Sequence, residues 1–170
     1  SESAARLPGF QGVKRRQELR GEARGVSVLD DFAHHPTAVR ATLEAVRARF
    51  PGRRAFAVFE PRSNTSRRRT FQQDYVDALA VADHVVVLEV PDEPIYSATG
   101  EVTELFSAQE LCRALRARGI PAHAFSDVDA IVSHLVASHR EGDVALVMSN
   151  GAFGNIWEKL LAALRSQPAA

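Results

Sequence analysis

Two adjacent acids and two adjacent histidines stand close together in the segment Asp30 to Pro36. A carboxylate at such a point can accept both hydroxyls of a ribose, and histidines before a helix start can help to hold an anion. A metal site is an alternative, although adjacent histidines usually point apart and no third ligand follows at helical spacing. Helix capping or burial of the histidines is a further alternative.

The segment Glu60 to Arg69 is rich in arginine and small polar residues. Guanidinium groups form forked, charge-assisted hydrogen bonds with carboxylates, so this segment could bind an acidic ligand. The run Arg67 to Arg69 could equally be a solvated start to the next helix. The predicted ligand-binding part is therefore its beginning, which comprises Arg62, Ser63, Asn64 and Thr65.

A third segment, Met148 to Ile156, has the pattern of a strand end, a glycine-bearing turn and a helix start. Such a turn can form a local anion cradle, although many strand-to-helix turns carry glycine. The sequence contains neither a G-x-G-x-x-G motif nor a G-x-x-x-x-G-K-[ST] motif. The chain is therefore expected to lack a phosphate-gripping P-loop of its own.

The elements that must position these segments alternate between buried-type strands and helices. Strands are expected over 14–22, 26–29, 55–59, 84–88, 122–125 and 144–148, and helices over 36–50, 71–80, 108–118, 128–138 and 156–164. This order predicts a Rossmann-like three-layer α/β/α fold, whose sheet of about six strands is mostly parallel with one antiparallel edge strand. Ligands bind beyond the carboxyl ends of the strands in such sheets, which is where all three segments fall.

The composition is that of an ordinary globular domain: 170 residues, 45% hydrophobic, with 21 basic and 21 acidic residues. We expect one domain over 10–166, a linker over 1–9 and a tail over 167–170. The balanced charge argues against nucleic-acid or membrane partners. The single cysteine, Cys112, excludes an internal disulfide and a thiolate metal site, and it fits a cytoplasmic protein. No signal peptide or membrane-spanning run is found.

Three motifs together resemble the Mur ligases: Asp-Asp-Phe-Ala-His-His-Pro-Thr (30–37), Glu-Pro-Arg-Ser-Asn-Thr (60–65) and Met-Ser-Asn-Gly (148–151). They are similar to the C-terminal domain of the murein peptide ligase branch, and the resemblance runs from about Phe10 to Leu164. The first motif is shared with the muramate–alanine ligases, which remain an alternative. Three residues depart from the pattern: Ser66 where methionine is common, and Ala152 and Asn155 where glycines are common.

The resemblance implies a bacterial, cytoplasmic, ATP-dependent acid–amino-acid ligase that joins UDP-N-acetylmuramate to L-Ala-γ-D-Glu-meso-diaminopimelate in peptidoglycan recycling. An N-terminal domain for the UDP-sugar and a central domain with the P-loop and most Mg²⁺ ligands would belong to the same polypeptide. This domain would close over ATP and bring the tripeptide amine, and it should not be competent alone.

The resemblance also implies roles for individual residues. Arg16, Asp31 and Phe32 would bind ATP, and His34 and His35 would lie at the reacting centre, where general-base help is conceivable. The peptide would be held by Arg62, Ser63, Asn64, Thr65, Ser149 and Asn150. No metal ligand is expected in this chain.

Two rival hypotheses are a receiver-like α/β module, which would need a lysine after the last strand, and a metal-dependent hydrolase using the histidines and acids.

Overall fold

The computed structural model describes residues 15–63, 67–89, 95–97, 100–102 and 104–168. The strands are β1 (Glu18–Ala23), β2 (Val26–Asp31), β3 (Ala55–Phe59), β4 (His84–Leu88), β5 (Ile95–Ser97), β6 (Gly100–Val102), β7 (Ala122–Phe125) and β8 (Val144–Met148). The helices are α1 (Pro36–Arg49), α2 (Gln72–Leu79), α3 (Ala108–Ala117), α4 (Val128–Ser138) and α5 (Ile156–Arg165), with short 3-10 helices η1 (Arg69–Phe71) and η2 (Phe153–Asn155).

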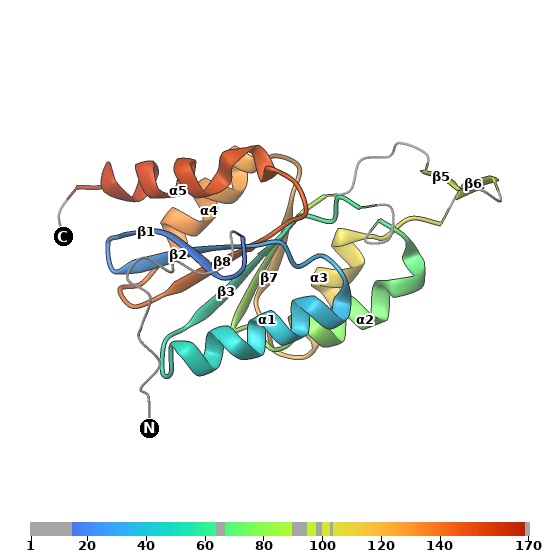
Figure 1. Cartoon of the computed structure of the whole chain (residues 1–170), viewed down its shortest axis with the longest axis horizontal. Coiled ribbons are helices and arrows are strands. Elements are labelled where there is room, and N and C mark those ends of the chain that lie inside the picture. Colours follow the sequence, from blue (N-terminus) through green and yellow to red (C-terminus); the bar gives the residue numbers. More distant parts are fainter. Residues whose placement is uncertain (1–14, 64–66, 90–94, 98–99, 103, 169–170) are drawn as a thin grey trace, which may run out of the picture.

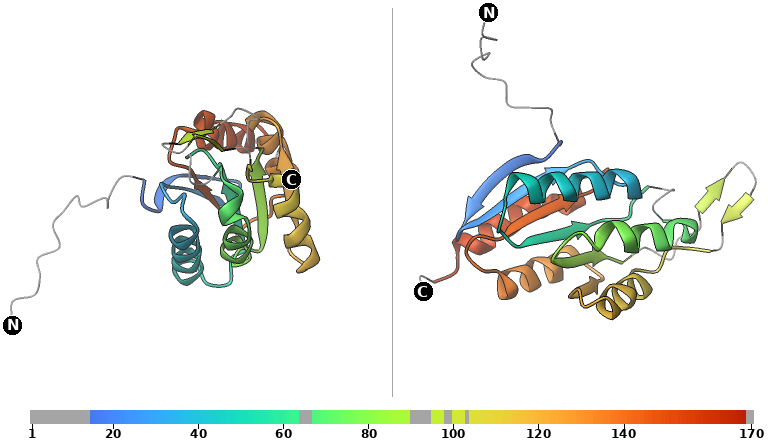
Figure 2. Two further views of the ribbon diagram at one scale, coloured as in Figure 1. Left: turned by 90° about the vertical axis from the view of Figure 1, so that its right-hand side faces the viewer. Right: turned by 90° about the horizontal axis from the view of Figure 1, so that it is seen from below.

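Six strands form one sheet in the order β1-β2-β8-β3-β4-β7, with β1 antiparallel to β2 and the other neighbours parallel. Helices α1, α2 and α3 cover one face, and α4 and α5 cover the other (Figure 1). The predicted three-layer fold with one antiparallel edge strand is therefore confirmed. The small hairpin β5–β6 was not predicted, and it projects from the body beyond the end of β4 (Figures 1 and 2).

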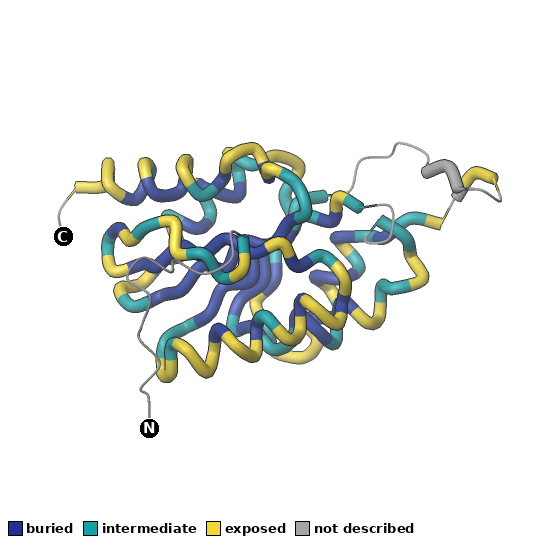
Figure 3. The backbone as a smooth tube through the Cα atoms, in the orientation of Figure 1, coloured by how far each residue is buried: buried dark blue, intermediate teal, exposed yellow. Residues whose placement is uncertain are grey.

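The central strands β2, β3 and β8 are buried along their whole length, and the exposed residues of the helices face outward (Figure 3). Burial on both faces is what an apolar strand between two helical layers requires. Large side chains fill the two layers, with Tyr75, Leu43 and Leu111 on the α1–α3 side and Phe153 and Ile131 on the α4–α5 side. Among the described helices, none combines the length and apolar character needed to cross a bilayer.

Local signals explain where several elements start and stop. The β1–β2 hairpin turns through Arg24 and Gly25, both at positive φ (54° and 73°), as a two-residue hairpin loop prefers. Pro36 opens α1, with its fixed φ suited to a first helical position. The Ser107 and Asp127 side chains accept the Glu110 and Ala130 amide protons and so cap α3 and α4. These caps fix the loops that leave the carboxyl ends of the strands.

Candidate functional site at the carboxyl ends of the strands

The sheet register aligns the ends of three adjacent strands. Asp31 of β2 and Phe59 of β3 both pair with Met148 of β8, which lies between them. The three segments singled out from the sequence therefore leave the sheet side by side, at the edge that Figure 2 (left) faces. The predicted common edge is confirmed for the described residues, whereas Asn64 and Thr65 lie outside them.

Arg15 joins two of these segments directly. Its Nη2 atom donates to the Ser149 and Gly151 carbonyl oxygens at 2.7 and 2.6 Å, and its Nε lies 3.3 Å from Asp30 Oδ2. Arg20 Nη2 donates to the same Asp30 oxygen at 2.9 Å. Asp30 is fully buried, so its charge needs these two cations. Arg15 was not predicted as a site residue, because it fell within the strand expected over 14–22, whereas it lies in the turn before β1.

Asp31 binds main-chain groups in this structure. Its Oδ2 accepts the Gln17 N–H at 2.9 Å, and its Oδ1 accepts the Ala33 N–H at 2.8 Å. The Phe32 N–H also donates to the Arg15 carbonyl at 2.7 Å. The carboxylate thus ties the segment before β1 to the loop before α1, although each oxygen keeps a lone pair for another donor. Its predicted contact with a ribose stays a prediction.

An open pocket of about 500 Å³ lies beside this loop, lined mainly by residues 15–16, 31–35 and the start of α1. Phe32 is 48% exposed there, unusually so for a large apolar side chain, and the Arg15 guanidinium lies 5.2 Å from its ring centre. The predicted ATP residues Arg16, Asp31 and Phe32 all line this pocket. An exposed aromatic ring beside arginines is suited to a ligand that is both flat and anionic.

The two histidines of the loop are held differently. His34 Nδ1 lies 3.0 Å from the Phe32 carbonyl, which can only accept, so Nδ1 carries the proton and Nε2 keeps the lone pair of the neutral ring. His35 caps α1: its Nδ1 accepts the Thr37 N–H at 3.4 Å, so Nε2 carries the proton. Of the two, His34 is thus the candidate base and His35 a candidate donor. Within the described part of the chain, neither joins three potential ligands close enough to share an ion.

A second open pocket, of about 410 Å³, lies at the carboxyl ends of β3, β4 and β7, and its lining includes Glu60, Arg62, Arg67, Glu89 and Ser126. The exposed Arg62 side chain lies directly over Gly151, where an added Cβ would stand 2.4 Å from Arg62 Cδ. Arg62 thereby reaches from the β3 loop to the β8 turn. Ser63, also described, is half-buried at the same loop.

The β8 turn is held by buried hydrogen bonds. Ser149 is fully buried; its Oγ donates to Glu60 Oε1 at 2.6 Å and accepts the Gly151 N–H at 2.9 Å. Ser149 therefore shapes the turn, and a direct peptide contact through its hydroxyl would require these bonds to change. Asn150 Oδ1 is buried without a hydrogen-bond partner among the described residues. Since such an oxygen is costly to bury alone, Asn150 is the better candidate for a ligand contact.

Two departures from the family pattern find an explanation here. Ala152 has φ −80°, an ordinary helical value, so alanine is not strained there. The left-handed residues of the turn are Phe153, Gly154 and Asn155, with φ values of 46°, 56° and 54°. Asparagine tolerates this region better than most residues, which fits its presence at position 155.

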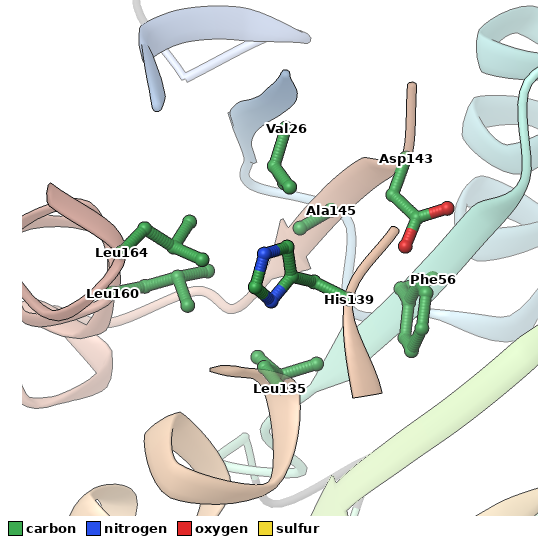
Figure 4. A pocket seen from close by; sticks show the side chains of 8 residues that line it. All are labelled: Val26, Phe56, Leu135, His139, Asp143, Ala145, Leu160 and Leu164. Atoms are coloured by element: carbon green, nitrogen blue, oxygen red, sulfur yellow. The ribbon is translucent and has the colours of Figure 1, made fainter. Parts of the chain in front are cut away.

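A further cavity lies at the amino ends of the strands and has room for about one water molecule. Figure 4 shows the His139 ring among the Leu135, Leu160, Leu164 and Ala145 side chains that line it. His139 Nδ1 contacts the Val136 carbonyl at 2.5 Å. This cavity is a small packing space far from the segments above, and it is too small for a substrate.

The fold and the gathered polar edge define a three-layer α/β domain whose polar residues collect at the carboxyl ends of the strands. The chain belongs to the Mur ligase family: the model described as "Mur ligase, glutamate ligase domain" matches residues 15–151. The UDP-N-acetylmuramate–L-alanyl-γ-D-glutamyl-meso-2,6-diaminoheptandioate ligase of Escherichia coli K12 is 42% identical over 171 residues, which cover all of this chain and 34% of that protein. Several UDP-N-acetylmuramate–L-alanine ligases also match, at 34–40% identity.

Solved structures of Mur ligases are also similar to this chain. The murein peptide ligase of Psychrobacter arcticus aligns with a TM-score of 0.75 and 33% identity, over 94% of this chain and 32% of that one. A domain from Haemophilus ducreyi, crystallised separately, aligns with a TM-score of 0.67 and 35% identity, over 88% of this chain and 99% of that one. The chain thus spans about a third of the length of its curated relatives, and a domain of this extent can fold by itself.

Proposed function

We propose that this chain is the C-terminal domain of an ATP-dependent ligase that joins UDP-N-acetylmuramate to L-Ala-γ-D-Glu-meso-diaminopimelate. The observation that carries the proposal is the continuous edge that Arg15 and Arg62 make from three strand ends. The highest sequence identity cited above, 42% to the E. coli enzyme of that name, supports the choice of substrate. The alanine ligases are the second candidate, because they share the Asp-Asp-aromatic-x-His-His-Pro motif and reach 40% identity.

In this reaction ATP phosphorylates the lactyl carboxylate of the muramate, giving ADP and an acyl phosphate. The tripeptide amine then attacks the carbonyl, phosphate leaves, and the amine loses a proton. The chain's part would be positioning: Phe32 and Arg16 face ATP, Asp31 its ribose, and Arg62, Ser63, Asn64, Thr65 and Asn150 the peptide. Holding the amine close to the carbonyl in the geometry of attack can lower the activation barrier by about 7–11 kcal/mol, the range of the best intramolecular reactions.

His34 Nε2 would be the atom that takes the amine proton, because its Nδ1 is engaged by the Phe32 carbonyl. The arginines suit the carboxylates of the tripeptide. The central and N-terminal domains of the same polypeptide would supply the P-loop, the UDP-sugar site and most Mg²⁺ ligands. The isolated chain should therefore neither hydrolyse ATP nor form the amide.

The test gives the complete polypeptide ATP, Mg²⁺ and UDP-N-acetylmuramate together with either the tripeptide or L-alanine, and identifies the product by mass spectrometry. We expect the tripeptide adduct and stoichiometric ADP. Preferential formation of the alanine adduct would assign the chain to the second candidate, and no amide product with either amine would refute both. ATP turnover by the 170-residue chain alone would contradict the proposed division between domains.

A further inference from the structure

Three histidines distant in sequence meet on the face of the sheet that α4 covers. His84 begins β4, His123 lies in β7 and His134 in α4. One ring nitrogen from each lies within 4.8 Å of the others, and the two Nε2 atoms of His84 and His134 are 3.1 Å apart. The candidate ligase site follows the last residue of β4, whereas His84 is its first, so this cluster is separate from it.

The fold itself brings these rings together. In the β4–β7 register His123 pairs with Val86, and alternation along the strand puts His84 on the same face as Val86. Phe56 stacks on the His84 ring with centres 4.5 Å apart and planes 22° apart, and the Phe125 ring lies 5.1 Å from that of His134. Aromatic contacts on two sides therefore limit how far the histidines can turn away.

The spacing of two of the nitrogens is close to that of metal ligands. Bonds of about 2.0–2.1 Å to a tetrahedral Zn²⁺ place two histidine nitrogens about 3.3 Å apart. The 3.1 Å between His84 Nε2 and His134 Nε2 is near that value. His123 is half-buried, and its ring nitrogen, which lies within 4.8 Å of the other two, would have to move closer as the ion binds. Solvent can supply a fourth ligand at this partly open edge.

The 3.1 Å between the two Nε2 atoms is also a hydrogen-bond distance, so in the metal-free chain one of these nitrogens donates its proton to the other. A bound ion would take the place of that proton between the same two nitrogens. Two arginines face the cluster. Arg54 is held in an ion pair with Asp143 at 2.7 Å, and Arg116 donates to the Ala122 carbonyl, so neither occupies the space between the rings.

We propose that His84, His123 and His134 bind one Zn²⁺ ion, with water or an anion in the fourth position, and that the ion ties α4 to β4 and β7. Three neutral imidazoles suit late first-row ions and give Mg²⁺ or Ca²⁺ no oxygen ligands. The ion would stabilise the fold and would take no part in the ligase reaction. This site could not be predicted from the sequence, because the spacings 84–123–134 match no metal motif.

The experiment uses the chain without a histidine tag. After equilibration with Zn²⁺ and removal of unbound metal, elemental analysis should find about one Zn²⁺ per chain, and Zn²⁺ but not Mg²⁺ should raise the unfolding temperature. Substitution with Co²⁺ should give the visible absorption of a tetrahedral nitrogen site. His134→Gln should lower Zn²⁺ affinity at least about tenfold, because a loss of about that size is seen even when only a residue that hydrogen-bonds to a metal ligand is replaced.

The matched control is His139→Gln, which removes a histidine just after α4 that is outside the cluster. It should bind Zn²⁺ like the parent chain. If His134→Gln does not fold, His123→Gln at the half-exposed position takes its place with the same expectation. Substoichiometric metal, or equal loss in the cluster and control variants, would overturn the proposal. Neither result would affect the proposed ligase function, which does not use these residues.

Discussion

The substitution Gly151→Ala tests how the β8 turn and the β3 loop form one surface. A Cβ on residue 151 would lie 2.4, 2.6 and 2.9 Å from Arg62 Cδ, Nε and Cζ, distances that real Cβ atoms do not adopt. All three atoms belong to an exposed, flexible side chain, and Gly151 needs no positive φ, since it is absent from the glycines that have one. The alanine should therefore displace Arg62 and leave the backbone in place.

The size of the effect follows from what Arg62 would do. A hydrogen bond to a charged group contributes about 1.5–3 kcal/mol, which corresponds to about 10- to 100-fold in a binding or rate constant. We expect Arg62→Ala and Gly151→Ala each to lower kcat/KM for the tripeptide by an amount in this range. The unfolding free energy should change by less than about 1 kcal/mol, because only an exposed side chain moves.

The assay is steady-state phosphate release by the complete ligase, with the tripeptide varied and the other substrates saturating. In the double variant, Gly151→Ala should add little to Arg62→Ala, because the side chain it displaces is already gone. KM for ATP should stay unchanged, and the exposed Arg113→Ala on α3 provides a matched arginine control. Wild-type kcat/KM in Gly151→Ala, or fully additive losses in the double variant, would refute the reasoning.

Three further predictions concern the isolated chain. Asp143→Ala should reduce the unfolding free energy by about 3 kcal/mol in denaturant titrations, because it breaks a buried, two-pronged pair with Arg54 (3.0 and 2.7 Å). Cys112 should resist alkylation until the chain unfolds, because burial excludes reagent and raises its thiol pKa to about 11. In chelator, the contribution of His84 to the unfolding free energy should fall by up to about 1.4 kcal/mol for each unit by which the pH is lowered from 6.5 to about 4, because His84 stays neutral when folded but protonates when unfolded. The same pH slope in His84→Gln would contradict this assignment.

Burial leaves a uniform apolar run in the strands 55–59 and 144–148, which lie between two helical layers and were predicted to the residue. The strands 84–88 and 122–125 were also predicted to the residue, although each contains a histidine and most of 122–125 is only half-buried. The edge strand was predicted from Lys14 but begins at Glu18, because Arg15 and Gln17 adopt positive φ values of 57° and 46°. The hairpin β5–β6 was missed because three-residue strands carry too little periodicity to be recognised.

The position of the candidate site could be predicted because polar residues stand at or just beyond the carboxyl ends of the strands, although β2 runs two residues further than predicted and includes Asp30 and Asp31. The direction in which single side chains point could not be predicted from the sequence. Arg15 rather than its neighbour Arg16 bonds the β2 and β8 segments, a difference set by the turn before β1. Likewise, burial of the Ser149 hydroxyl depends on Glu60 from another strand, a contact with a long sequence separation. Such contacts between side chains that are distant in sequence leave no local pattern in the sequence.

The residues of the candidate site fall into two physical groups with different consequences. Asp30, Asp31 and Ser149 are buried and bound to other parts of the edge, so replacing them should cost stability as well as activity. Phe32 and Arg62 are exposed and serve the isolated fold little, so replacing them should reduce activity alone. A nucleotide held by the adjoining domain would cover the Phe32 ring and so remove its apolar surface from water. If the proposed function holds, the exposed group is therefore where the nucleotide and the adjoining domain would make contact.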